Sequence, residues 1–203
     1  MKIICVGRNY AAHAKEMSSD VPTEPVIFMK PDTALHRDTQ PFYLPELNSS
    51  IHHEIEVVLK INREGKHIAE KFAGTYFDEI AVGIDLTARD LQAKLKKAGL
   101  PWELSKAFDS SAITGKFFPK QQFENLADLN FELEINGTPV QQGNTKDLIF
   151  SFDFLISYIS RFITLRKGDL IFTGTPEGVG PIHIADRLKG SLAGFECFEI
   201  LVK

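Results

Sequence analysis

Short apolar runs, some of them alternating with polar residues, recur along this chain, and this pattern favours a fold built mainly from β-strands. The clearest run is FELEINGTPVQQG, residues 131–143, which alternates on both sides of the Asn136-Gly137 pair. Asn-Gly between two such runs is a strong hairpin signal, because both residues accept the positive φ angles of the turn. Further strands are predicted at KIICVG, EPVIFMKP, IAVGID, DLIF and FECFEILVK. Strands outnumber helices, and no regular alternation of strand and helix is present.

Helices are predicted in three places. Asn9 is suited to cap a short helix in RNYAAHAKEM, and a second helix should follow the strand that ends near Asp85 and should itself end at Gly99. Residues 151–168 have apolar side chains at helical spacing, with Lys167 and Gly168 at the end, so we expect a core helix without chemistry. Residues 32–50 are rich in Pro, Ser, Asp and Thr and are predicted to form a loop.

The composition limits the classes of function. Hydrophobic residues make up 43% and charged residues 25% of the 203 residues, which fits one ordinary globular domain. The net charge of −4 argues against a nucleic-acid partner. Cys5 and Cys197 lie far apart in apolar runs, so we expect buried thiols in a reducing compartment. The apolar start is too short for a signal peptide and residues 148–165 contain Asp153 and Arg161, so we expect a soluble cytoplasmic protein without a membrane partner.

The stretch HHEIE, residues 52–56, places two carboxylates in a predicted half-buried strand that runs from His52 to Ile61. Strand side chains alternate between faces, so Glu54 and Glu56 share one face, with Cα atoms roughly 6.5–7 Å apart. Such carboxylates repel each other unless a cation binds between them or one takes up a proton. A solvated strand face is the ordinary explanation of an isolated E-x-E pattern.

Two polar pairs lie on the predicted helices. His13 and Glu16 are three residues apart, which suits either an exposed pair or a base that a carboxylate orients. Asp85 ends a strand, where it is either a ligand or a helix cap. Arg89 and Gln92 follow on the next helix, where a solvated face is the alternative to substrate contact.

Two further candidates are less specific. Lys106 in GLPWELSKAFD is uninformative by itself. The loop TGTPEGVG, residues 173–180, offers backbone N–H groups to an anion, but it also suits a tight turn and lacks the lysine of a nucleotide-binding loop.

Glu54, Glu56 and Asp85 together would form an all-oxygen site. Such ligands suit Mg²⁺, Mn²⁺ or Ca²⁺ rather than Zn²⁺, and three carboxylates with positions left for water and substrate fit Mg²⁺ or Mn²⁺ best. The residues alone therefore indicate a metal-dependent enzyme that acts on a small anion.

Several longer stretches carry a family resemblance. In chain order they are GRNYAAHAKEM, PVIFMKP, HHEIEVVL, GIDLTARDLQ, GLPWELSKAFD, ITLRKGDLIFTGTPEGVGP and the closing strand. Over nearly the whole chain this order resembles the fumarylacetoacetate hydrolase superfamily, and most closely its short acylpyruvase and oxaloacetate decarboxylase group. The resemblance implies a β-rich α+β fold with layered mixed β-sheets rolled around the active site, a few short helices, a single catalytic domain over residues 1–203, and a homodimer.

The resemblance also implies a role for each matching residue. Glu54, Glu56 and Asp85 match the metal ligands of the family, which implies one Mg²⁺ or Mn²⁺ ion. The matches to catalytic positions are His13, Glu16 and Lys106. The matches to substrate-binding positions are Arg89, Gln92 and Thr175, and Arg8 and Asn9, beside the helix that carries His13, are expected to help bind the substrate.

The implied reaction is hydrolytic cleavage of a carbon–carbon bond in acylpyruvates or related 2,4-dioxo acids. Glu16, through His13, would activate a water, pyruvate would leave as an enolate held by the metal, and Lys106 and Gln92 would stabilise negative charge. The same enolate forms when oxaloacetate loses CO₂, so oxaloacetate decarboxylase and isomerase of unsaturated 2-oxo diacids are alternatives. The His13–Glu16 pair favours the hydrolase. Fumarylacetoacetate itself is disfavoured, because residues 32–50 form a short segment and no N-terminal extension precedes the motifs.

The sequence gives less support to two other classes of function. A non-catalytic binder of 2-oxo acids would not need Glu16 or Lys106, and both are present. A cupin-like metal barrel needs alternating histidines, whereas His52 and His53 are adjacent. We therefore expect a small 2-oxo acid as the partner of this chain.

Overall fold

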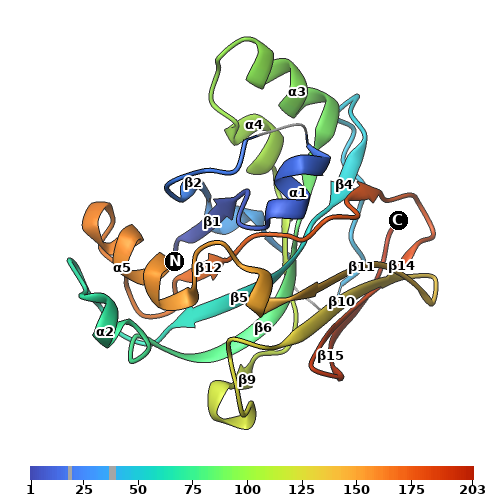
Figure 1. Ribbon diagram of the computed structural model, residues 1–203. Coiled ribbons are helices and arrows are strands. Elements are labelled where there is room, and N and C mark those ends of the chain that lie inside the picture. Colours follow the sequence, from blue (N-terminus) through green and yellow to red (C-terminus); the bar gives the residue numbers. More distant parts are fainter. Residues whose placement is uncertain (18–19, 37–39) are drawn as a thin grey trace.

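The structure, a computed structural model, describes residues 1–17, 20–36 and 40–203. Eight strands within these ranges form a mixed sheet at the centre of the fold (Figure 1). In order across the sheet they are β2 (Val26–Lys30), β1 (Ile3–Gly7), β12 (Leu170–Phe172), β5 (Ile55–Ile61), β6 (Phe77–Asp85), β8 (Ala112–Thr114) and β3 (Leu35–His36), and β9 (Phe118–Pro119) pairs with β6 outside this path. The pairs β1–β12 and β3–β8 are parallel, and the other pairs are antiparallel.

Two smaller antiparallel sheets complete the β-structure of the described residues. One contains β11 (Thr138–Asn144), β10 (Asn130–Ile135), β14 (Arg187–Leu192) and β15 (Phe195–Leu201), and the other contains β13 (Gly180–Pro181), β4 (Ile51–His53) and β7 (Thr87–Ala88). The predicted hairpin is confirmed: Ile135 pairs with Thr138, and Asn136 and Gly137 have φ angles of 53° and 78°. The predicted β-rich α+β class is confirmed as well.

The predicted half-buried strand from His52 to Ile61 differs from the structure in two ways. The chain leaves the sheet of β4 at Glu54 and enters the large sheet as β5, so one predicted strand is two. β5 is also buried on both faces, because Val57 packs into one hydrophobic cluster and Val58 into another on the opposite face, and both are 0% exposed. Glu56 therefore points into the protein and not into solvent.

Five α-helices lie within the described ranges, with three short 3₁₀ turns. The helices are α1 (Ala11–Glu16), α2 (Glu70–Ala73), α3 (Arg89–Lys97), α4 (Glu103–Lys106) and α5 (Phe152–Phe162), and the 3₁₀ turns are Asp32–Ala34, Lys120–Gln122 and Thr145–Asp147. Figure 1 shows α1, α3 and α4 together beyond one end of the large sheet. None of the helices in the described part of the chain is long and apolar enough to cross a membrane.

Three local predictions were wrong. Asn9 does not cap α1: the N-cap is Tyr10 without a side-chain bond, and Asn9 instead binds backbone groups of Phe150 and Thr173. Helix α5 ends at Phe162, because the next residue is extended. Residues 32–50 contain β3 besides loop, while positions 37–39 lie outside the described residues.

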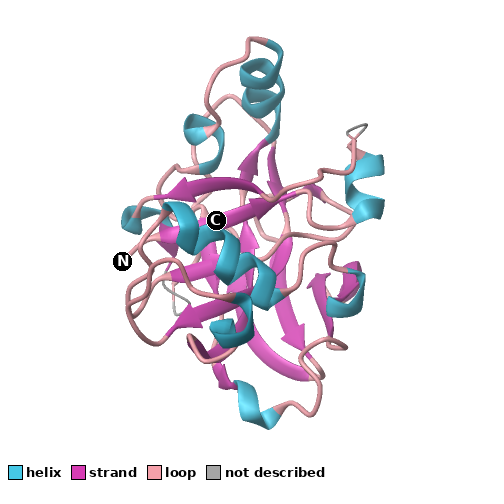
Figure 2. Ribbon diagram, turned by 60° about the vertical axis from the view of Figure 1, so that its left-hand side comes forward, coloured by secondary structure: helices cyan, strands magenta, loops and turns pink. Residues whose placement is uncertain are grey.

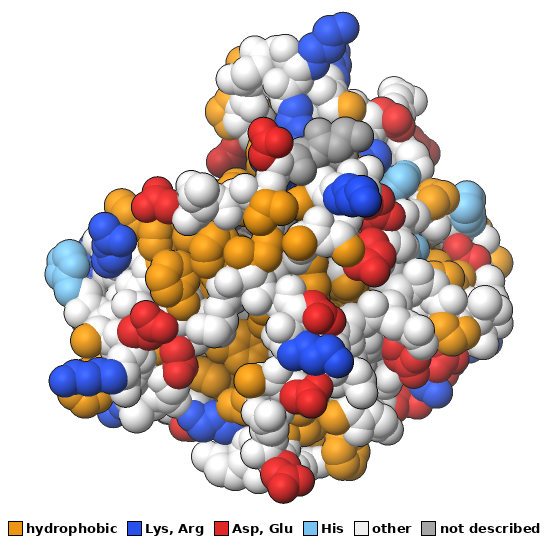
Figure 3. Space-filling view, viewed as in Figure 1, with side chains coloured by type: hydrophobic (Ala, Val, Ile, Leu, Met, Phe, Trp, Pro, Cys, Tyr) orange, Lys and Arg blue, Asp and Glu red, His pale blue; other side chains and the backbone are white. Residues whose placement is uncertain are grey.

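Helix α5 crosses in front of the strands in Figure 2 and buries one apolar face, as predicted. Its outer side carries Phe154, Tyr158 and Phe162, and their rings continue a row that begins at Phe150, just before the helix, with successive centroids 5.4, 6.1 and 5.4 Å apart. Phe162 is 62% exposed, and Figure 3 shows hydrophobic side chains gathered over this part of the surface. The helix thus contributes both to the core and to an apolar surface.

Candidate active site

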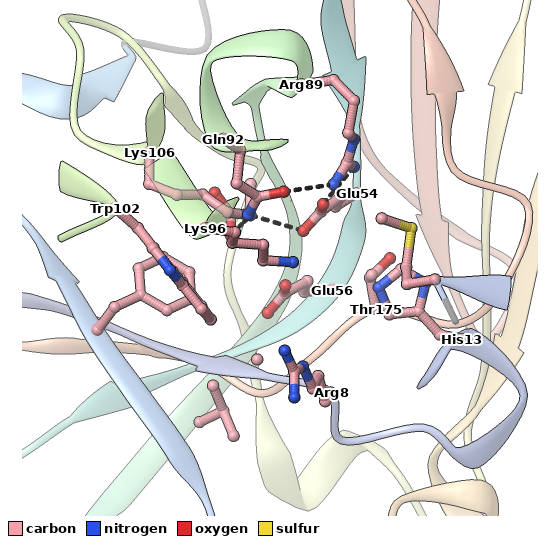
Figure 4. Close-up of a pocket in the computed structure, with 15 residues that line it drawn as sticks. Arg8, His13, Glu54, Glu56, Arg89, Gln92, Lys96, Trp102, Lys106 and Thr175 are labelled. Carbon is pink, nitrogen blue, oxygen red and sulfur yellow. Dashed lines mark hydrogen bonds and ion pairs between the residues drawn. The ribbon is translucent and has the colours of Figure 1, made fainter. Parts of the chain in front are cut away.

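A pocket of about 440 Å³, including the part open to solvent, lies where α1, α3 and α4 meet the large sheet (Figure 4). This volume is within the usual range for small-molecule sites. The pocket is lined by Val6, Gly7, Arg8, His13, Met17, Phe28, Glu54, Glu56, Asp85, Arg89, Gln92, Lys96, Trp102, Lys106 and Thr175.

The three predicted metal ligands meet at this pocket. Ligand oxygens of Glu54, Glu56 and Asp85 all lie within 4.8 Å of one another, and all three side chains are buried. The antiparallel pairing of β5 with β6 brings them together, since Ile55 pairs with Ile84 and the N–H of Asp85 donates to the carbonyl of Glu54 at 2.9 Å. Residues about thirty positions apart in sequence therefore form one cluster.

Three cations balance the charge of this cluster. Lys106 Nζ donates to Glu54 Oε2 and to Asp85 Oδ2, both at 2.8 Å. Lys30 Nζ lies 2.7 Å from Asp85 Oδ1, and Arg89 donates to Glu54 Oε1 at 2.6 Å. The role of Lys30 was missed by the sequence analysis, although it ends an apolar run where a buried lysine needs a partner.

The two glutamates of the cluster have opposite pKa shifts. Burial opposes ionisation of Glu54, but Lys106 and Arg89 outweigh it and lower the pKa of this carboxyl below its usual value. Burial and then the charge of Asp85 raise the pKa of Glu56 well above its usual value, against a backbone hydrogen bond from Gly174. Without a further cation, Glu56 is thus the carboxyl that holds a proton.

These residues fit a hard divalent ion. The ligand set is all oxygen, which suits Mg²⁺ or Mn²⁺. Asp85 Oδ1 is buried without a hydrogen bond among the described residues, although Lys30 is close. Glu56 Oε2 accepts the N–H of Gly174 at 2.7 Å, and a carboxylate repelled by its neighbours gains from a cation.

His13 and Glu16 form the predicted pair. His13 Nδ1 lies 3.0 Å from Glu16 Oε2, and Glu16 Oε1 accepts the N–H of Gly178 at 3.0 Å. Because a carboxylate only accepts, Nδ1 donates and Nε2 carries the lone pair. His13 lines the pocket and Glu16 does not, so the carboxylate orients the imidazole from outside.

The loop after β12 supplies another part of the pocket wall, and Figure 4 shows Thr175 beside His13. Thr175 Oγ1 accepts a hydrogen bond from Gln141 Nε2 at 2.9 Å, which leaves the hydroxyl proton of Thr175 free to donate to an anion. Gln141 Oε1 in turn accepts the N–H of Ile55 at 3.0 Å and contacts His53 Nδ1 at 2.7 Å. Gln141, which the sequence analysis missed, therefore ties this loop to the strand of the glutamates.

Nine of the predicted site residues line the pocket: Arg8, His13, Glu54, Glu56, Asp85, Arg89, Gln92, Lys106 and Thr175. Arg89 also donates to Gln92 Oε1 at 2.8 Å. Asn9 does not line the pocket, because it is fully buried and bonded to backbone groups. Lys96 and Trp102 also line it, and neither was predicted as a site residue, although Trp102 lies in the stretch GLPWELSKAFD.

Known proteins are similar to this chain over nearly its whole length. Residues 2–199 match the family described as "Fumarylacetoacetate (FAA) hydrolase C-terminal". The mitochondrial oxaloacetate tautomerase of Mus musculus is 44% identical over 201 residues, which cover 99% of this chain and 91% of that protein. The mitochondrial oxaloacetate decarboxylase of Dictyostelium discoideum is 39% identical, covering 100% of this chain and 94% of that protein.

A solved structure is similar in both sequence and shape. The fumarylpyruvate hydrolase from Pseudomonas aeruginosa, in complex with Mn²⁺ and pyruvate, has a TM-score of 0.94 and 39% identity, covering 100% of this chain and 89% of that chain. Both relatives above are mitochondrial by name, so the cytoplasmic location of this chain stays a prediction.

Proposed function

Because this chain belongs to the fumarylacetoacetate hydrolase family, we propose that it is a divalent-metal-dependent enzyme that interconverts the keto and enol forms of oxaloacetate. The names of the similar proteins support oxaloacetate chemistry better than the acylpyruvate hydrolysis preferred from the sequence. They favour the alternative that the sequence analysis kept, in which a 2-oxo diacid passes through its enolate.

The observation that carries the proposal is one oriented base facing three clustered carboxylates across one pocket. A divalent ion held by Glu54, Glu56 and Asp85 would act as a Lewis acid that polarises the 2-oxo group of the substrate. His13 and Glu16 supply the proton transfer.

In the forward direction, the lone pair of His13 Nε2 takes a proton from C3 of keto-oxaloacetate. The C3–H electrons form the C2–C3 double bond, and the carbonyl electrons move to the C2 oxygen, which then takes up the proton. Glu16 holds the imidazole in the required tautomer and stabilises its charged form. The net change is transfer of one proton from carbon to oxygen, so no further reactant is needed.

Other side chains bind and polarise the substrate. Lys106 lies between Glu54 and Asp85, and its buried positive charge would stabilise the negative charge that develops on the substrate oxygen. The free hydroxyl proton of Thr175 suits the C1 carboxylate. Decarboxylation passes through an enolate too, so it is an expected side reaction.

Carbon–carbon hydrolysis is the second candidate. The His13–Glu16 pair can also orient a water, and a structurally similar protein is a fumarylpyruvate hydrolase. Hydrolysis differs from tautomerisation because water is then a reactant and a carbon–carbon bond breaks.

Three assays with and without Mn²⁺ separate these reactions. Loss of enol absorbance from fresh enol-oxaloacetate reports tautomerisation, pyruvate formation reports decarboxylation, and loss of acetylpyruvate reports hydrolysis. We expect tautomerisation to have the highest kcat/KM, to stop with EDTA, and to fall on the order of 10²-fold or more in His13→Gln. A higher kcat/KM for hydrolysis of acetylpyruvate than for tautomerisation of oxaloacetate would show that hydrolysis is the main activity.

A further inference from the structure

Two cations in the pocket, Arg8 and Lys96, have no part in the mechanism above. Both line the pocket, and Figure 4 shows their charged ends pointing into it near Glu56. Among the residues described, neither forms an ion pair with a carboxylate. Positive groups that face a pocket without an acidic partner indicate an anionic ligand.

The carboxylate cluster does not need these two cations. Lys106 and Arg89 contact Glu54, while Lys106 and Lys30 contact Asp85, all at 2.6–2.8 Å. Glu54 and Asp85 thus have three cation partners before any metal binds, while Glu56 holds a proton, and a divalent ion would add two positive charges. Arg8 and Lys96 are therefore an excess of positive charge.

The backbone and a neighbouring ring hold both cations toward the pocket. Arg8 has a φ angle of 61°, a left-handed conformation that is uncommon outside glycine and often marks a functional position. The next residue, Asn9, is held by hydrogen bonds to the carbonyls of Phe150 and Thr173. Lys96 Nζ lies 5.2 Å from the centroid of a tryptophan ring of the same pocket.

The two cations also influence each other. Burial first, and then the charge of Arg8, lower the pKa of Lys96 below its usual value. A carboxylate placed between them would relieve this repulsion and accept charge-assisted hydrogen bonds from both groups.

We propose that Arg8 and Lys96 form a subsite for the second carboxylate of the substrate, so that the enzyme selects 2-oxo diacids over 2-oxo monoacids. This inference rests on the proposed function, because it places the 2-oxo end of the substrate at Glu54, Glu56 and Asp85 and its far end at the two cations. A substrate with a neutral far end leaves both cations without a partner.

Turnover of two isosteric substrates tests the selectivity. Oxaloacetate and its 4-amide, 2-oxosuccinamate, have nearly the same shape and differ in charge at the far end. We expect the Mn²⁺-loaded protein to prefer oxaloacetate by about tenfold or more in kcat/KM, as for loss of a charge-assisted hydrogen bond. The Arg8→Gln/Lys96→Gln double variant should lose most of this preference. Lys97→Gln, the same change at an exposed neighbour on α3, should keep it.

Binding without turnover separates the subsite from the reaction. Calorimetry on the Mn²⁺-loaded protein would compare 2-oxoglutarate with 2-oxopentanoate, which has a methyl group in place of the far carboxylate. If oxaloacetate is not turned over but the diacid binds better and the double variant abolishes that preference, the subsite stands and the proposed function fails. A double variant that retains the preference of the unmodified protein overturns the subsite.

Discussion

Lys30 and Asp85 form an ion pair inside the protein, with Nζ 2.7 Å from Oδ1 and both side chains at most 1% exposed. Lys30 also donates to the backbone carbonyls of Leu86, Lys106 and Ser111. The pair thus joins the end of β2 to the end of β6 and to the segment after α4. An isolated buried charge is costly, so each partner depends on the other.

Replacing Lys30 by Met should therefore destabilise the metal-free protein by about 3 kcal/mol or more, the usual cost of breaking a buried ion pair. Urea unfolding in EDTA would measure this loss. The matched control is Lys60→Met, which breaks the half-exposed Lys60–Glu79 pair and should cost about 1 kcal/mol or less. If Lys30→Met and Lys60→Met lowered the free energy of unfolding equally, the buried Lys30–Asp85 pair would stabilise the protein no more than an exposed pair does.

Glu56→Ala should abolish stabilisation by Mn²⁺ and lower Mn²⁺ affinity about 100-fold or more, because it removes one of three oxygen ligands. Calorimetric titration and thermal unfolding with Mn²⁺ would both report this change. Glu79→Ala, on the exposed side of the neighbouring strand, is the control and should bind Mn²⁺ normally. An unchanged Mn²⁺ affinity in Glu56→Ala would show that Glu56 is not a metal ligand.

Mn²⁺ affinity should rise with pH, by up to about tenfold per unit, until pH exceeds the raised pKa of Glu56. The metal ligand is the carboxylate, and the buried carboxyl must lose its proton first.

The stability of the metal-free protein should change with pH in the opposite direction. Glu56 contributes stability below its unfolded pKa near 4.5, and this contribution is lost as pH rises through the folded pKa. Unfolding across pH, with EDTA or with Mn²⁺, would show both trends, and Glu56→Gln should flatten them.

Glu16→Ala should lose on the order of 10²-fold of any acylpyruvate hydrolysis, because His13 then lacks the carboxylate that orients it. Oxalate, which mimics the enol of pyruvate, should still inhibit, since Glu16 does not line the pocket. Steady-state kinetics on acetylpyruvate with oxalate as inhibitor would test both statements. If Glu16→Ala hydrolysed acetylpyruvate as fast as the unmodified protein, a group other than the His13–Glu16 pair would have to activate the water.

Gln141→Leu should destabilise the protein by about 2–4 kcal/mol, because it removes partners from buried polar groups of Ile55, Thr175 and Pro176. It should also raise KM more than it lowers kcat, because Thr175 loses its fixed orientation while His13 is untouched. Gln142→Leu, at the exposed neighbouring position on β11, is the control and should change neither quantity strongly. A normal KM in a folded Gln141→Leu protein would limit Gln141 to a structural role.

The sequence by itself determined the hairpin at Asn136-Gly137, the strand-rich class and the helix after Asp85, because these depend on local periodicity and turn chemistry. The motifs also indicated Glu54, Glu56 and Asp85 as one cluster, and the pairing of β5 with β6 brings them together. Periodicity did not show that β5 is buried on both faces, since burial depends on which strands and helices cover it.

Only the tertiary structure decided which polar side chains share the pocket. Lys30, Lys96 and Gln141 lie on different elements and were not predicted as site residues, because their positions depend on long-range strand pairing and helix packing. Asn9 has the local features of a helix cap, yet buried carbonyls of Phe150 and Thr173 bind it instead. Buried polar groups need hydrogen-bond partners, and in the folded protein these partners come from residues that are distant in sequence. Local sequence patterns therefore do not predict them.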